Sequence, residues 1–177
     1  FGEGMSWGPL NEQMKVDLLK KQGDIQYEIP WNTLGEYLQF LEEKGVSTNI
    51  ASFIGATTLR INAVGYEDRE PNPKELKLMT DLVHQGMKEG ALGIGSSLIY
   101  APAFYSSTKE LIEICKIAAQ YDGMYISHMR SEGNKILESV DELMTIAKEA
   151  GIRSEIYHLK QSGKKKLGQA RCCYSKN

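Results

Sequence analysis

The protein contains 177 residues, of which 41% are hydrophobic and 25% are charged, and its formal net charge is −2. This composition is ordinary for a globular α/β protein, and the near-neutral charge gives no electrostatic reason to expect a nucleic-acid or membrane partner. No apolar run approaches the roughly 18 residues of a membrane span, and no basic segment followed by an apolar one lies near the N-terminus. We therefore expect a cytoplasmic protein.

The first predicted element is a helix that begins with a capping box. Thr33 and Glu36 have the required spacing, apolar residues then line one face, and Gly45 is expected to end the helix. Residues 46–54 are rich in β-branched side chains and are followed by Gly55. This stretch predicts a buried strand of a parallel sheet.

A second helix is predicted to open at Asn72-Pro73, because proline is favoured at the first helical position, and Gly90 is expected to end it. The short apolar stretch 91–95 then predicts a second buried strand. Its glycines match neither the G-x-G-x-x-G pattern nor a Walker sequence. They indicate close strand packing rather than a phosphate-binding loop.

A third helix is predicted to begin at Ser107 or Thr108 and to end at the turn 122–123, after which residues 124–128 form a third strand. The pattern of one helix followed by one strand is then repeated once more in the sequence. This regular alternation is the main indication of the fold.

The last predicted helix runs from about Lys135 to Gly151 and leads into a strand at 152–158. Four strands separated by helices describe crossover units of a parallel sheet, which is either doubly wound or part of a (β/α)₈ barrel. A barrel needs eight strands and about 250 residues, so on the second interpretation the chain is a partial, incomplete barrel of four central βα units. We assign this domain to residues 1–163, and we expect the basic stretch 164–177 to be a disordered or frameshifted tail.

Two histidines stand at the ends of successive predicted strands, His128 and His158. The carboxyl ends of parallel barrel strands gather on one face, and adjacent strands lie about 4.8 Å apart. The two imidazoles are therefore expected to be neighbours that one metal ion, zinc first, can bind together. Structural hydrogen bonding is the alternative for both histidines, and position alone leaves it open. His84 falls inside a helix and is interpreted as structural or exposed.

The segments 127–133 (SHMRSEG) and 157–160 (YHLK) resemble the two central histidine motifs of the D-aminoacylases, also called N-acyl-D-amino-acid deacylases. Gly2-Glu3-Gly4, 49–55, and 89–93 followed by 98–100 look like further family stretches in the same order, so that the resemblance covers roughly residues 1 to 163. The resemblance implies an amidohydrolase barrel with zinc at the strand ends, in which His128 and His158 match ligands from the fifth and sixth strands.

The resemblance also implies an activity, which is hydrolysis of the linear amide bond of a small-molecule N-acyl-D-amino acid to a D-amino acid and a carboxylate. A metal-activated water attacks the amide carbonyl while an aspartate moves the proton. Lys160 and Tyr100 are candidate substrate-binding residues, although a lysine past a strand end is commonly just solvated. Arg130 and Glu132 are expected either to orient the His128 imidazole or to form an ion pair in the loop.

Parts of the implied machinery find no counterpart in the sequence: the His-x-His pair of the first strand, the metal-binding cysteine of the second and the catalytic aspartate of the eighth. Cys115 falls in a helical pattern and Cys172-Cys173 in the tail, and all three are interpreted as reduced thiols. The sequence opens at Phe1 without a methionine. We expect a fragment that holds no catalytic residue, is inactive alone and is poorly soluble because strand edges are uncovered. The alternative is a non-catalytic α/β binding module with structural histidines.

Overall fold

The computed structural model describes residues 1–162, so the predicted tail at 164–177 lies outside the described residues. The elements in chain order are α1 (Glu12–Lys20), α2 (Leu34–Lys44), β1 (Ile54–Gly55), α3 (Ala56–Ala63), α4 (Pro73–Lys88), β2 (Gly93–Ser97), η1 (Ala103–Tyr105), α5 (Thr108–Ala119), β3 (Met124–His128), α6 (Ile136–Ala150) and β4 (Arg153–Ile156). None of the helices in this described part is long and apolar enough to cross a membrane.

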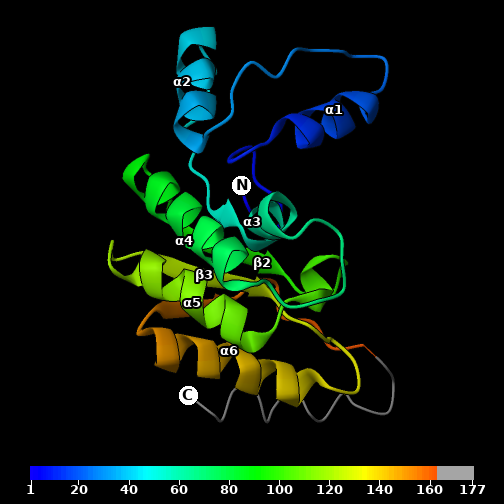
Figure 1. Cartoon of the computed structure of the whole chain (residues 1–177), viewed down its shortest axis with the longest axis vertical. Coiled ribbons are helices and arrows are strands. Elements are labelled where there is room, and N and C mark those ends of the chain that lie inside the picture. Colours follow the sequence, from blue (N-terminus) through cyan, green and yellow to red (C-terminus); the bar gives the residue numbers. More distant parts are fainter. Residues whose placement is uncertain (163–177) are drawn as a thin grey trace.

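The strands form one parallel sheet in the order β1-β2-β3-β4. Helices α4, α5 and α6 run side by side along this sheet, each packed against the next (Figure 1). Within residues 1–162 the strand order is sequential and lacks the reversal that characterises a doubly wound sheet. The expectation of an α/β fold built on a parallel sheet is confirmed.

The helix boundaries follow from capping chemistry that is visible in the sequence. Thr33 accepts a hydrogen bond from the Glu36 amide at 3.1 Å, and Gly45 ends α2 in the left-handed conformation with φ of 76°. Asn72 caps α4 in the same way by accepting from the Glu75 amide at 3.0 Å. These predicted helices are confirmed because their start and stop signals are local.

The predicted strand at 46–54 is wrong for most of its length. Only Ile54 and Gly55 pair with β2, and helix α3 follows at once. Residues 46–49 and Ala51 are exposed, so this stretch lacks the burial on both faces that a strand of a parallel sheet has. The predicted strand at 91–95 lies two residues later, at Gly93–Ser97.

Two further differences concern the ends of the chain. Helix α1 was not predicted; its signal is Asn11, whose side chain accepts from the Met14 amide at 2.9 Å. The predicted strand 152–158 is shorter, because β4 ends at Ile156 and the chain then turns. His158 lies past this strand end with a positive φ of 41°.

A buried ion pair joins helix α3 to helix α5. Nη1 of Arg60 in α3 lies 2.7 Å from Oε2 of Glu110 in α5, and the two side chains are 0% and 1% exposed. Arg60 also donates to the carbonyl oxygens of Glu67 and Arg69, at 3.0 and 2.6 Å. Burial raises the pKa of the Glu110 carboxyl, and the Arg60 guanidinium opposes that shift. The pair therefore fixes both α5 and the loop that follows α3.

We expect Glu110→Gln to lower the free energy of unfolding by about 3 to 5 kcal/mol, because the buried guanidinium of Arg60 loses its counter-charge. Urea unfolding followed by circular dichroism measures this loss. Glu113→Gln is the matched control on the same helix, since Glu113 pairs at the surface with Lys116, and should change the value by less than about 1 kcal/mol. Equal stability of the two variants would contradict the prediction.

Candidate metal centre

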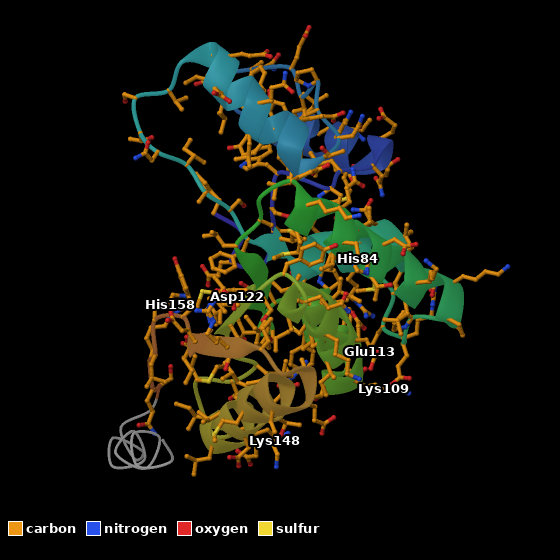
Figure 2. All side chains as sticks on the ribbon, turned by 90° about the vertical axis from the view of Figure 1, so that its left-hand side faces the viewer. His84, Lys109, Glu113, Asp122, Lys148 and His158 are labelled. Atoms are coloured by element: carbon orange, nitrogen blue, oxygen red, sulfur yellow. The ribbon has the colours of Figure 1, made fainter. Side chains whose placement is uncertain are left out.

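The two predicted histidines meet at the carboxyl ends of neighbouring strands. His128 is the last residue of β3, and His158 lies two residues beyond β4. Their ring centroids are 4.6 Å apart with the ring planes at 88°. Figure 2 shows His158 well away from His84, which lies on α4 and bonds to Tyr121 through Nδ1 at 2.9 Å. His84 is thus separate from the pair, as expected.

A carboxylate that sequence reasoning missed completes this cluster. Oε1 of Glu3 lies 3.1 Å from Nδ1 of His128 and 2.9 Å from Nε2 of His158. The three potential ligand atoms all lie within 4.8 Å of one another. The sequence had pointed to His128 and His158 alone as candidate ligands, and Glu3 is a third candidate. The available signal was the Gly2-Glu3-Gly4 stretch, which places an acidic residue between two glycines inside a family-like motif.

Glycines in the sheet allow the Glu3 backbone to approach closely. A Cβ atom on Gly95 would lie 1.9 Å from the carbonyl oxygen of Gly2, and one on Gly55 would lie 2.2 Å from that of Gly4. Both distances are far below van der Waals contact, so no side chain fits at either position. The amide of Thr57 donates to the Gly4 carbonyl at 3.0 Å and holds the segment in place.

The donor set suits a divalent metal ion. Two imidazole nitrogens and one carboxylate oxygen are the three protein ligands of many catalytic zinc sites, which leave the fourth position open. Ligand atoms held at about 2.0 to 2.2 Å from a tetrahedral ion stand roughly 3.3 to 3.6 Å apart. The observed separations of 2.9 and 3.1 Å at Glu3 are a few tenths of an ångström shorter. The cluster is therefore close to a binding geometry, and small side-chain movements would complete it.

Cys115 does not contribute to this centre. It is fully buried on α5, and burial raises the pKa of its thiol. Metals bind the thiolate form, which such surroundings suppress. The expectation of a reduced, non-ligating thiol at this position agrees with the structure.

A second carboxylate, that of Glu132, approaches the far side of the His128 ring. Oε1 of Glu132 lies 3.1 Å from Nε2 of His128, and Nζ of Lys160 lies 3.0 Å from the same oxygen. Nε2 is buried and has no aligned hydrogen-bond partner. Glu132 thus contacts both the His128 imidazole and a loop cation, so both roles considered for it remain predictions. Arg130 pairs elsewhere, with Glu142 at 2.9 Å.

Arg130 holds the loop that carries Tyr100. Its guanidinium donates to the carbonyl oxygens of Phe104 and Ser106 at 2.6 and 2.9 Å. Tyr100 is 62% exposed, and its ring centroid lies 5.6 Å from that of His128 in an edge-to-face arrangement. Tyr100 therefore borders the cluster while its side chain stays open to solvent.

A cavity of about 550 Å³ opens beside the carboxylate of Glu3. One wall is the N-terminal segment from Phe1 to Met5. The other wall is formed by residues in or next to the sheet strands, namely Phe53, Ser97, Ile126 and Tyr157. The lining is mixed, with polar and apolar surface in about equal parts, and Glu3 is its charged residue.

The chain is 32% identical over 171 residues to a D-aminoacylase from Alcaligenes xylosoxydans xylosoxydans. The match covers 95% of this chain and 34% of that relative, so the chain spans about a third of the relative's length. No protein-family model matches the chain.

Solved structures show the same likeness. The crystal structure of a D-aminoacylase, described as defining a novel subset of amidohydrolases, matches with a TM-score of 0.85 and 30% identity, covering 98% of this chain and 36% of that one. N-acyl-D-glutamate deacylase from Bordetella bronchiseptica, complexed with zinc and a phosphonate inhibitor, matches with a TM-score of 0.85 over 99% of this chain and 36% of its own. Its identity is 22%, so it supports the fold alone.

We expect Glu3→Gln to weaken Co²⁺ binding by at least the roughly 10- to 100-fold loss that follows removal of a partner of a metal ligand. The reason is that the amide loses the negative charge facing both imidazoles. Titration of the metal-free chain with Co²⁺, followed by visible absorption, measures the affinity. Glu12→Gln, on the exposed side of α1, is the control. If both variants bind Co²⁺ equally, Glu3 has no part in the site.

Proposed function

We propose, because this chain belongs to the D-aminoacylase family of amidohydrolases, that it forms part of a zinc-dependent hydrolase of N-acyl-D-amino acids. The bond cleaved is a linear amide, and the products are a D-amino acid and a carboxylate. The observation that carries the proposal is the convergence of Glu3, His128 and His158 on one point at the strand ends.

Zinc is the metal that we propose for this centre. A set of two histidines and one glutamate occurs in hydrolytic zinc sites, and zinc supplies Lewis-acid chemistry for amide hydrolysis. A similar donor set also holds Fe(II) in oxygenases. The likeness to hydrolases rather than oxygenases supports zinc here.

We also propose that residues 1–163 form part of a (β/α)₈ barrel. The sequential parallel order of the four strands supports this, as do the helices that cover one face of the sheet. The TM-score of 0.85 with a D-aminoacylase crystal structure adds to that support. In such a barrel the strand ends carry the site, which is where His128 lies.

Tyr100 is proposed to contact the substrate, because its exposed ring borders the His128 imidazole. The hypothesis that Lys160 binds the substrate stays a prediction. Its ammonium lies 3.0 Å from Oε1 of Glu132. Cytoplasmic location likewise stays a prediction from the sequence.

These 177 residues hold no His-x-His pair. No aspartate belongs to the ligand cluster within the part of the chain that the structure describes. We therefore propose that this chain by itself binds metal without turning over substrate. Its own residues would hold and orient the ion, and no aspartate among residues 1–162 stands at the cluster to take the proton-moving role.

The test is a zinc titration of the metal-free chain by isothermal calorimetry, with an amine-release assay on N-acetyl-D-amino acids in parallel. We expect one zinc per chain, binding that is lost in the His128→Ala, His158→Ala double variant, and no amine release. The unrelated His84→Ala variant should bind zinc normally, because that ring lies on the helix layer.

The competing account is a binding module whose histidines are structural. It has an observation in its favour, because both imidazoles already bond to Glu3. A chain that binds no zinc, or binds it equally well without His128 and His158, would favour this account. Robust turnover by the chain alone would overturn the proposal that it is inactive.

A further inference from the structure

The outer edge of β4 carries backbone groups that no other strand uses within residues 1–162. The sheet ends at β4, which pairs with β3 alone in this part of the chain. The amide of Tyr157 donates to the carbonyl oxygen of Ser127 at 2.9 Å, so the odd-numbered residues here turn their backbone groups toward β3. Ser154 and Ile156 therefore direct their amide and carbonyl groups to the open edge. Such an edge is a template for a further strand.

The side chains of this edge strand carry opposite charges on one face. Arg153 and Glu155 point to the face that they share with Ile126, the register partner of Glu155. The Arg153 side chain is 69% exposed, and its Nη2 lies 3.3 Å from Oδ1 of Asp122, which is itself 93% exposed. Glu155 is exposed as well. The edge thus presents a positive and a negative side chain to solvent, two residues apart.

We propose that β4 pairs in antiparallel fashion with β4 of a second copy of this chain, about a two-fold axis at Ser154. A two-fold axis makes an interface in which each contact occurs twice. Ser154 then lies opposite Ser154 of the partner subunit, and their outward-facing backbone groups exchange two hydrogen bonds. Arg153 lies opposite Glu155 of the partner subunit, and Glu155 lies opposite the partner's Arg153. These are non-hydrogen-bonded positions, whose Cα atoms stand about 4.5 Å apart.

Charge selects this register among those that the backbone allows. Antiparallel pairing requires outward-facing residues to stand opposite one another, which an axis at residue 153, 154 or 155 satisfies. An axis at Arg153 would set two guanidinium groups opposite each other, and an axis at Glu155 would set two carboxylates opposite each other. Like charges in directly opposite positions are destabilising. Only the axis at Ser154 gives two pairs of opposite charge, so this edge is complementary to itself.

The test is sedimentation velocity of the full 177-residue chain over a range of concentrations. We expect a reversible dimer that weakens as salt is added, because its ion pairs are exposed. Arg153→Glu and Glu155→Arg each place like charges at both paired positions, and each should weaken self-association by about 10- to 100-fold. An equimolar mixture of these two variants has opposite charges at both positions, and should associate as strongly as the unchanged chain.

Two further variants complete the design. Lys109→Glu makes the same change of charge on α5, where the side chain is exposed (Figure 2), and should leave association unchanged. Ser154→Pro removes the central outward-facing amide without altering charge, and should reduce association as strongly as the charge variants do. Proline is tolerated on an edge strand where the N–H faces outward. Circular dichroism checks that each variant keeps the fold.

Three results would overturn the inference. These are an unchanged chain that stays monomeric at every concentration, single charge variants that associate like Lys109→Glu, and a mixture that associates no better than its two components. The inference makes no use of the proposed metal site, because Arg153 and Glu155 are not among the candidate ligands. Its outcome is therefore independent of the zinc titration.

Discussion

The proposed metal centre depends on how closely one backbone segment approaches the sheet. The carbonyl oxygens of Gly2 and Gly4 lie where the side chains of Gly95 and Gly55 would otherwise stand. This contact places the carboxylate of Glu3 between two imidazoles that are themselves positioned by the sheet. A methyl group at either sheet position would push the segment outward, and the carboxylate with it.

Charge gives the centre its chemical character. The imidazole of His128 stands between two carboxylates, with Glu3 at Nδ1 and Glu132 near Nε2. Lys160 brings a positive charge to the Glu132 side, whereas the Glu3 carboxylate pairs within residues 1–162 with the two imidazoles. In a partly buried site such charges interact more strongly than in water. A divalent ion beside Glu3 would balance the remaining negative charge.

Two arginines hold loops near the centre against the helices in similar ways. Arg60 pairs with Glu110 and holds the loop after α3, while Arg130 pairs with Glu142 and holds the loop after β2. In each case a planar guanidinium bonds to a helix carboxylate and to loop carbonyl oxygens together. The loops at the strand ends are thus tied to the helix layer, and Tyr100 is kept next to His128.

The sequence by itself determined the features whose causes are local. The capping box at Thr33 and Glu36 and the strand at 124–128 could be predicted because their signals lie within a few residues, and the paired histidines followed from the regular alternation of helices and strands. Only the tertiary structure decided that residues 46–53 are not a strand, since that depends on which apolar surface is available to cover. It also decided the role of Glu3, which lies 125 residues before His128. No local pattern encodes a contact at that separation, because it arises from the close approach of two backbones that only the folded sheet brings together.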